Sequence, residues 1–310
     1  MPSTKTGVLI MAYGTAPSMK DEDIFNYLRH ILQYYRRIDP SEAEFNDLKE
    51  RYQQTGESPL YRITESMIIG LQQALQQNTS AQFQTYMAMK HSPPFIEEVV
   101  PQMAKDGLEK AIAIAIAPFR SRLSTEGYYH IVKDANDSLE QPMNWSYAKD
   151  WNLHPLFLQL WQERLENALR KKEDASVIFT NHSLPARIQE WNDPYGELFG
   201  ATAASLAKQC NLRSWTTAYQ SQGGGNQPWL GPSLEQTLNE WKDSGHRNFV
   251  IAPIGFLMDH LEVLYDLDIV AASQARKLGI ALSRTSMPND DPRFIAMLAD
   301  VVQTQYQQNI

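Results

Sequence analysis

The segments KDGLEKAIAIAIAPF (residues 105–119) and KDSGHRNFVIAPI (residues 242–254) follow the same pattern. In each of them, a polar turn that contains glycine leads into an apolar run that closes with Ala-Pro. A short, continuous apolar run that follows a turn is typical of a strand covered on both faces. The recurrence of this unit predicts that the chain is built from two similar halves.

On both sides of these segments, short apolar runs alternate with longer stretches of helical character. We predict strands at 7–12, 82–89, 110–117, 143–149, 176–181, 214–220, 248–253 and 280–284. We predict helices at 21–35, 41–54, 60–77, 94–105, 125–139, 155–171, 193–209, 234–243, 259–277 and 292–307. This alternation is typical of right-handed βαβ crossovers and parallel sheets. We therefore expect an α/β fold of two halves that meet near residues 150–175 and leave a cleft between them.

Composition excludes several classes of protein. The 310 residues carry 28 Lys+Arg against 36 Asp+Glu, a formal net charge of −8, which disfavours general nucleic-acid binding. The longest apolar run, 111–117, is far shorter than the ~20 residues that a membrane-spanning helix needs. Because Cys210 is the only cysteine, the chain has no internal disulfide and no four-cysteine zinc or iron–sulfur site. With no signal-peptide pattern before the first strand, we expect a cytoplasmic protein without stable membrane insertion.

Ligands of open parallel sheets bind beyond the carboxyl ends of the strands. This rule selects the loops at 13–15, after Pro118, at 181–185 and at 255–262. His182 leaves a buried strand in one of them, and an imidazole with an unperturbed pKa near ~6.5 suits proton transfer or metal binding. A histidine that merely ties down the turn fits this position equally well.

Two further features lie in these loops. Asp259, Glu262 and Asp266 share one face of a predicted helix, and such carboxylates suit a divalent cation or a path for protons. Acids in a first turn more commonly complement the helix dipole and cap its free N–H groups. Tyr13, after the first strand, either faces a ligand or packs the end of the sheet. No GxGxxG follows the first strand and no GxxxxGK[ST] is present, so a phosphate cradle is poorly supported.

Arginines in two regions suit substrate carboxylates, which they pair in bidentate fashion. Solvated helix faces are the commoner explanation for such residues. The early group consists of Arg29, Arg36, Arg37 and Arg51, with Lys49, and the second group consists of Arg120 and Arg122.

Several motifs, taken in chain order, together resemble the ferrochelatases. They are MAYGT (11–15), KH (90–91), PFIE (94–97), AP (117–118), HSLP (182–185), PWLGP (228–232) and HLEVLYD (260–266). The likeness is closest to the coproporphyrin type of Gram-positive bacteria and runs from Gly7 to about Thr304. It implies two Rossmann-like halves, residues 1–150 and 151–310, around a porphyrin cleft. We expect the last helix to pack back on the first half, and the protein to be a monomer.

The resemblance also implies a reaction, the insertion of Fe²⁺ into a porphyrin with release of two pyrrole protons. His182 would take a pyrrole proton or contact the metal, and Glu262 would relay protons or deliver iron. Tyr13 would be an oxygen ligand to iron on the opposite face of the ring, and Asp266 would continue the acidic path outward. Iron and porphyrin are then substrates, and we expect no permanently bound cofactor and no iron–sulfur cluster.

Other matching positions contact the porphyrin and its propionates in the family. They are Arg51, Tyr52, Ser58 and Tyr128, together with Arg36, chosen over Arg37 where the chain carries extra residues.

Two departures from the family pattern stand out. Val270 replaces a usual third carboxylate, which argues against a second, outer metal site. Arg120 and Arg122 occupy a segment that is usually polar and small, and we hypothesise that they pair the carboxylates of the substrate.

The expected function is therefore insertion of Fe²⁺ into coproporphyrin III to give coproheme. Tyr13 and the lack of a membrane-binding extension favour this porphyrin over protoporphyrin IX, and its four propionates suit the early arginines. The alternatives are insertion into protoporphyrin IX, a porphyrin or haem carrier without catalysis, and a cobalt or nickel chelatase for a related tetrapyrrole.

Overall fold

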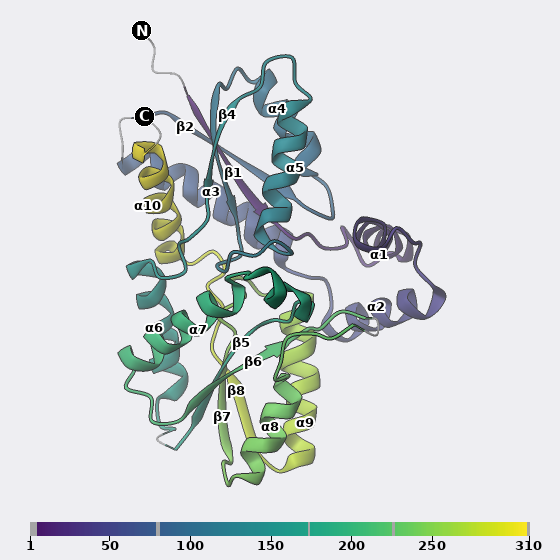
Figure 1. Cartoon of the computed structure of the whole chain (residues 1–310), viewed down its shortest axis with the longest axis vertical. Helices are drawn as coiled ribbons and strands as arrows, with labels where there is room; N and C mark the ends of the chain where they lie inside the picture. Colours follow the sequence, from purple (N-terminus) through teal and green to yellow (C-terminus); the bar gives the residue numbers. More distant parts are fainter. Residues whose placement is uncertain (1–4, 79–80, 173, 225–226, 309–310) are drawn as a thin grey trace.

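The computed structural model describes residues 5–78, 81–172, 174–224 and 227–308. Within these residues the chain forms two four-stranded sheets, one in each half of the elongated molecule (Figure 1). Their strand orders are β2-β1-β3-β4 and β6-β5-β7-β8, and every pairing is parallel. In each sheet the first strand along the chain lies between the second and the third, so the predicted repeat of two α/β halves is confirmed.

The predicted strands are all present, with ends within two residues of the expected positions. They are β1 (Thr6–Ala12), β2 (Phe83–Met89), β3 (Lys110–Ala115), β4 (Asn144–Ala148), β5 (Ser176–His182), β6 (Trp215–Gln220), β7 (Asn248–Ala252) and β8 (Ala281–Arg284). All seven residues of β1 are buried, because helices cover both faces of the sheet. In β5 only the last residue, His182, is not fully buried, which leaves it at the carboxyl end with access to solvent.

Helices connect and cover the strands. In the first half they are α1 (Asp21–Arg36), α2 (Glu42–Thr55), α3 (Leu60–Asn78), α4 (Ile96–Lys105) and α5 (Thr125–Asp137). In the second half they are α6 (Pro155–Leu169), η1 (Ala186–Trp191), α7 (Tyr195–Gln209), α8 (Leu234–Asp243), η2 (Val263–Ala271), α9 (Ala272–Leu278) and α10 (Pro292–Gln308). The short 3₁₀ helix η1 lies where no helix is predicted from the sequence.

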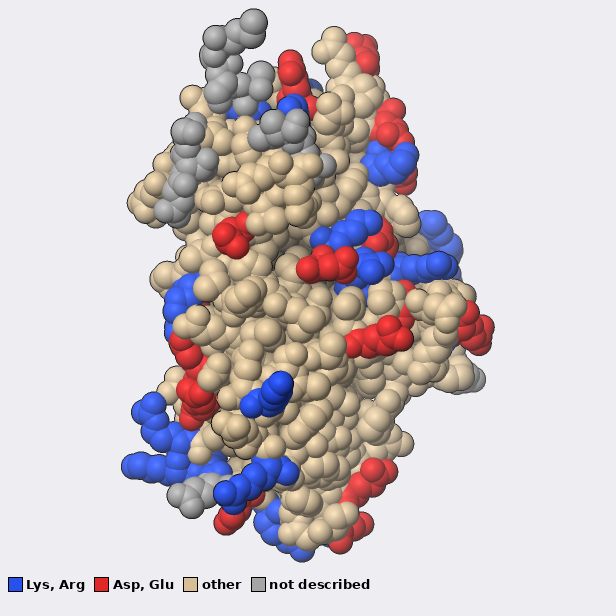
Figure 2. All heavy atoms as spheres, turned by 60° about the vertical axis from the view of Figure 1, so that its left-hand side comes forward, with Lys and Arg blue, Asp and Glu red and all other residues tan. Residues whose placement is uncertain are grey.

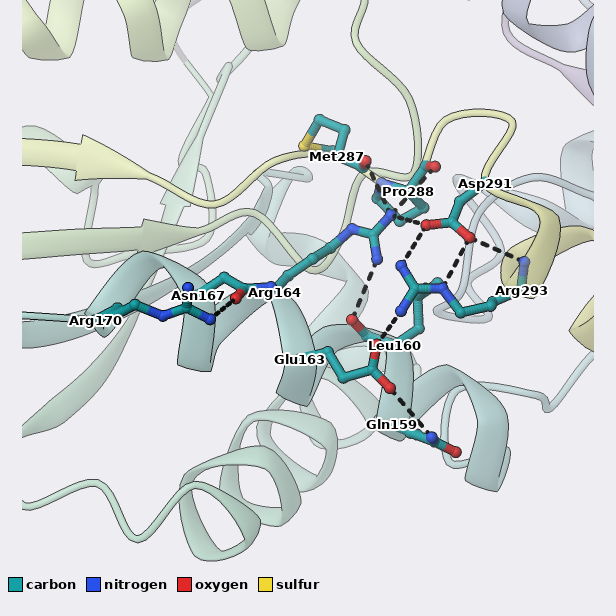
Figure 3. A network of polar contacts seen from close by, with 10 residues as sticks. All are labelled: Gln159, Leu160, Glu163, Arg164, Asn167, Arg170, Met287, Pro288, Asp291 and Arg293. Carbon is teal, nitrogen blue, oxygen red and sulfur yellow. Dashed lines mark hydrogen bonds and ion pairs between the residues drawn. The ribbon is translucent and has the colours of Figure 1, made fainter.

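The last helix crosses from one half to the other. Helix α10 packs against α3, β3 and β4 of the first half and against α6 of the second (Figure 1). A buried arginine holds the segment that leads into α10. Arg164 of α6 donates to the Asp291 carboxylate at 2.9 Å and to the Met287 carbonyl at 3.3 Å (Figure 3). Arg293 pairs with the same carboxylate at 2.6 Å, so the carboxylate holds α6 and the start of α10 together.

The region predicted as one helix over 259–277 differs from the prediction. Residues 263–271 form a π-helix, whose i→i+5 hydrogen bonds widen each turn, and α9 follows it directly. Asp259 lies before the helix, where it pairs with Arg284 at 2.9 Å and accepts from Asn289 at 2.8 Å. The prediction that Asp259 shares a helix face with Glu262 and Asp266 is therefore wrong, because a half-buried arginine at the end of β8 holds its carboxylate elsewhere.

Charged groups on the surface are mixed. On the face drawn in Figure 2, acidic and basic side chains stand beside one another in small groups, with broad uncharged stretches between them. None of the described helices is long and apolar enough to cross a membrane.

Candidate active site

A cleft of about 1500 Å³ lies between the two halves. Its lining includes residues 12–15 after β1, 116–119 after β3, 181–185 at the end of β5 and 255–258 after β7. Each of these segments leaves the carboxyl end of a strand, as the sequence predicts for a ligand site. Helices α1 and α2 contribute further lining residues and project to one side of the junction between the halves (Figure 1).

The centre of the second-half wall is a carboxylate between two imidazoles. Glu262 Oε2 lies 3.6 Å from His182 Nε2 and 3.7 Å from His260 Nε2. The Nδ1 atom of His182 contacts the Ser183 carbonyl, and that of His260 contacts the Met258 carbonyl at 2.9 Å. Because a carbonyl only accepts, Nδ1 carries the proton in both rings, which leaves each Nε2 to face the carboxylate.

This arrangement favours the charged forms of His182 and Glu262. Burial opposes the imidazolium of His182, but the Glu262 carboxylate and the Ser183 carbonyl outweigh it, so the pKa of His182 is raised. Burial also opposes the Glu262 carboxylate, yet His182 and then His260 hold the pKa of Glu262 well below its usual range.

Asp266 lies further along the π-helix and behaves differently. Burial and then the Glu262 charge raise the pKa of Asp266, and a hydrogen bond from the Ser221 hydroxyl only partly offsets them. Among the described residues, no three or more His, Cys, Asp or Glu side chains gather to hold one ion. Asp266 therefore does not complete a three-ligand group with His182 and Glu262. Val270, next along the helix, lines the cleft with 47% of its surface exposed.

Residues that the sequence did not single out hold His182 in place. The Tyr195 hydroxyl contacts Asn181 Oδ1 and the His182 carbonyl, each at 2.9 Å, and Asn181 Oδ1 accepts from the His182 amide at 2.9 Å. A Cβ at Gly255 would lie 1.9 Å from that Asn181 oxygen, so only glycine fits there. The sequence offered only a weak signal for these positioning residues, namely an Asn before His182 and a Gly after a strand.

The first-half wall is built from aromatic rings. Tyr13 leaves β1 and meets the edge of the His91 ring at 4.6 Å between centroids. Burial raises the pKa of Tyr13 well above its ordinary value, so its phenol stays protonated at neutral pH. Gly14 follows with φ of 111°, a left-handed conformation, and a Cβ there would lie 2.7 Å from Ser92 Oγ.

A buried lysine lies behind this wall. Lys90 is 2% exposed, and its Nζ lies 4.5, 5.2 and 5.0 Å from the ring centroids of Tyr34, Tyr35 and Tyr128. The same Nζ donates to the Tyr35 hydroxyl at 3.2 Å. Burial lowers the pKa of Lys90 to about 8, against a smaller opposite effect of Glu97. The sequence marked Lys90 only as part of a motif, and its tyrosine cage comes from α1 and α5.

Most of the predicted porphyrin-contacting residues line the cleft. Arg36, Arg51, Ser58 and Tyr128 do so together with Tyr13, His182, Glu262 and Asp266. Both arginines already have acidic partners, since Arg36 lies 3.2 Å from Glu44 and Arg51 lies 2.8 Å from Asp47.

Three predicted contact residues lie outside the set that lines the cleft. Tyr52 is buried, and its hydroxyl accepts from the Ala16 amide at 2.9 Å and lies 2.8 Å from Thr15 Oγ1. It therefore supports the loop after β1 rather than forming the surface of the cleft. Arg120 pairs with Asp150 at 2.9 Å, and Arg122 lies over the ring of Trp191 at 5.9 Å.

The fold agrees with solved structures of chelatases. The structure of SirB from Bacillus subtilis with Fe³⁺ matches with a TM-score of 0.60 at 11% identity, over 97% of this chain and 96% of that chain. The cobalt complex of the sirohydrochlorin chelatase SirB from Bacillus subtilis subspecies spizizenii matches with a TM-score of 0.59 at 11% identity, over 98% and 97%. The two halves and the cleft between them thus define a protein of the chelatase fold.

Sequence comparison gives the family. The sequence profile of the ferrochelatases matches residues 5–306. The coproporphyrin III ferrochelatase of Halalkalibacterium halodurans is 38% identical, with 98% of both chains covered. That of Listeria monocytogenes is 37% identical over 97% of this chain and 98% of its own, and the ferrochelatase of Herpetosiphon aurantiacus is 36% identical over 97% and 99%. The chain belongs to the ferrochelatase family of metal-chelating enzymes.

Proposed function

We propose that the protein inserts Fe²⁺ into coproporphyrin III, giving coproheme and two protons. The observation that carries this proposal is the His182–Glu262 pair, with Nε2 and Oε2 3.6 Å apart at the wall of the cleft. Support for this porphyrin comes from relatives named coproporphyrin III ferrochelatase, which are 37–38% identical along nearly the whole chain.

His182 is the base of the proposed reaction. Its Nδ1–H is occupied by the Ser183 carbonyl, so the free lone pair of the neutral ring is on Nε2. Fe²⁺ replaces two pyrrole protons at the ring nitrogens; Nε2 accepts them one after the other and passes each on toward solvent. The adjacent Glu262 carboxylate stabilises the imidazolium that forms.

Glu262 and Asp266 have different roles in the proposed proton path, because their pKa values shift in opposite directions. Glu262 has a lowered pKa and stays ionised, so it serves as an ionic partner for His182 and as an oxygen donor for incoming iron. Asp266 has a raised pKa because it lies buried near the Glu262 charge, so it holds a proton more readily on the way to solvent.

Tyr13 acts from the other wall. Its raised pKa keeps the phenol neutral at physiological pH, so it offers a neutral oxygen to iron on the face of the ring opposite His182. Tyr52 keeps the loop that carries Tyr13 in place through its contacts with Thr15 and Ala16.

The propionates are bound by polar residues of the first half. Arg36, Arg51, Ser58 and Tyr128 line the cleft and supply guanidinium and hydroxyl donors for carboxylates. The methylene stems and the macrocycle meet the apolar part of the lining, such as Leu60, which is buried.

We also propose that the protein works as a cytoplasmic monomer with no resident cofactor or iron–sulfur cluster. With Cys210 as the only cysteine, the chain cannot form a four-cysteine iron–sulfur site. Sedimentation equilibrium at micromolar concentration tests the monomeric state, and a dimer would contradict it.

Anaerobic Fe²⁺ insertion tests the function, followed by absorption spectra with coproporphyrin III and protoporphyrin IX at equal concentration. We expect coproporphyrin III to be metallated strongly in preference. His182→Ala should lose metal insertion and keep porphyrin affinity. His130→Ala is its matched control, because His130 is an exposed histidine of α5. Preference for protoporphyrin IX would overturn the choice of substrate, and binding of both porphyrins without metallation would identify a carrier.

A further inference from the structure

Two arginines from different halves share one indole ring at the junction. The guanidinium carbon of Arg187, in η1, lies 5.5 Å from the ring centroid of Trp191. The guanidinium carbon of Arg122, which precedes α5 in the first half, lies 5.9 Å from the same centroid. Both arginine residues are exposed, and Arg187 lines the cleft.

Neither guanidinium forms an ion pair with a described carboxylate, which sets these arginines apart from the others near the cleft. Arg36 and Arg51 are held by Glu44 at 3.2 Å and by Asp47 at 2.8 Å, and Arg120 is held by Asp150 at 2.9 Å.

Asp193 contacts the Arg122 backbone and is engaged by other donors as well. Asp193 Oδ2 accepts from the Arg122 backbone amide at 2.8 Å and from Ser121 Oγ at 3.1 Å, while Oδ1 accepts from the Tyr195 amide at 3.1 Å. The contact between Asp193 and Arg122 is therefore made through the Arg122 backbone amide.

Two like charges against one ring repel each other, and the repulsion is relieved when an anion lies between or beside them. A guanidinium group that stacks on a ring by its face keeps its N–H edges available for hydrogen bonds. A planar carboxylate accepts such edges in bidentate geometry.

We infer that Arg122, Trp191 and Arg187 form a carboxylate-binding site at the rim of the cleft, which receives a propionate of the porphyrin and joins the two halves around it. The inference rests on the proposed function for the identity of its ligand. It assigns a second-half cation to a substrate with four carboxylates, whereas Arg36 and Arg51 both belong to the first half. Arg120, paired with Asp150, has no part in it.

The test is a binding titration of metal-free coproporphyrin III, followed by absorption and fluorescence at several salt concentrations. We expect Arg122→Ala and Arg187→Ala each to weaken binding about three- to tenfold and to reduce its salt dependence. Arg187→Glu should weaken binding further than Arg187→Ala, because it places a negative charge where the propionate lies.

Two controls separate charge pairing from packing. Arg213→Ala removes an exposed arginine that precedes β6, at the end of the second sheet away from the cleft, and should leave binding unchanged. Coproporphyrin III tetramethyl ester has no carboxylates, so its affinity should be the same in the wild type and in Arg122→Ala, Arg187→Ala and Arg187→Glu. An equal loss for ester and acid would overturn the inference, because the arginines would then act through packing.

The outcomes also separate this inference from the proposed function. Wild-type affinity and salt dependence in the Arg122→Ala/Arg187→Ala double variant would overturn the site, whatever the rate of iron insertion. A wild-type protein that binds coproporphyrin III through these arginines without metallating it would overturn the function and support the site. Failure of the wild type to bind the porphyrin at all would overturn both.

Discussion

The pKa shifts on the two walls of the cleft favour opposite charge states. On the second-half wall, His182 and Glu262 lie 3.6 Å apart, the pKa of the imidazole is raised and that of the carboxylate is lowered, so both shift toward their charged forms. On the first-half wall, burial lowers the pKa of Lys90 to about 8 and raises that of Tyr13, so both move toward their neutral forms.

The difference follows from what surrounds each group. Burial disfavours charge in both pairs of groups, but only His182 and Glu262 have an opposite charge close enough to overcome it. Paired charges suit the exchange of protons, whereas the rings around Tyr13 and Lys90 provide a flat surface and a neutral oxygen ligand. The comparison therefore assigns proton transfer to the second half and positioning to the first.

The largest expected effect is on the base. His182→Ala should reduce iron insertion by about 10²- to 10⁴-fold, because it removes the Nε2 that accepts the pyrrole protons in the proposed reaction. Porphyrin affinity, measured by fluorescence titration, should stay close to that of the wild type. Retained insertion would show that the second wall is not the site of proton transfer.

Lys90→Met tests the lowered pKa of Lys90 through the pH dependence of the free energy of unfolding. An unfolded lysine titrates near ~10.4, so the native state binds fewer protons than the unfolded state between pH 8 and that value. Stability of the wild type should therefore rise with pH across this window, by about 3 kcal/mol from this group, and the variant should lack this rise.

Urea unfolding at several pH values measures this difference between the wild type and Lys90→Met. Lys208→Met, which changes an exposed lysine of α7, is the matched control and should follow the wild type. A variant with the same alkaline rise as the wild type would mean that Lys90 keeps an ordinary proton affinity.

Glu262→Gln should move the pH dependence of the reaction. In the wild type, insertion increases as pH rises through the raised pKa of His182, because the base must lose its proton first. Without the carboxylate, burial lowers that pKa, so the rising limb shifts to lower pH, and the maximal rate falls about tenfold. If the rising part of the pH–rate profile stays in place or moves to higher pH, the Glu262 carboxylate is not the cause of the raised pKa of His182.

The smallest effect concerns the loop after β1. Tyr52→Phe removes the hydroxyl that contacts Thr15 and Ala16, so it should cost about 1–2 kcal/mol in unfolding free energy. Porphyrin affinity should fall only slightly, since Tyr52 does not line the cleft. Tyr61→Phe, at a residue 42% exposed, should change stability by less than about 0.5 kcal/mol. Equal free energies of unfolding for Tyr52→Phe and Tyr61→Phe would show that the Tyr52 hydroxyl does not support the loop after β1.

Local sequence patterns predicted most of the architecture. Apolar runs marked the central strands β1, β3, β5 and β7, because a strand covered on both faces is apolar along most of its length. The rule that ligands lie beyond the carboxyl ends of parallel strands then selected the four loops that line the cleft. Neither step required knowledge of which residues touch across the chain.

Contacts between distant segments were less predictable. Helical spacing grouped Asp259 with Glu262 and Asp266, but Arg284 at the end of β8 draws Asp259 away, and the helix is a π-helix. Arg120 was grouped with Arg122, yet Asp150 after β4 neutralises only Arg120. In both cases the deciding partner comes from another strand end, which periodicity does not reveal.

The sequence by itself therefore determined the two repeated α/β halves, the edges where ligands bind and the chemical groups placed there. Hydrophobic periodicity reports which faces are buried, and this is enough for elements and layers. Only the tertiary structure decided that Glu262 lies between His182 and His260, that three tyrosines cage Lys90, and that Arg122 and Arg187 share one indole. Electrostatic character depends on atoms a few ångströms apart, and here those atoms come from opposite parts of the chain.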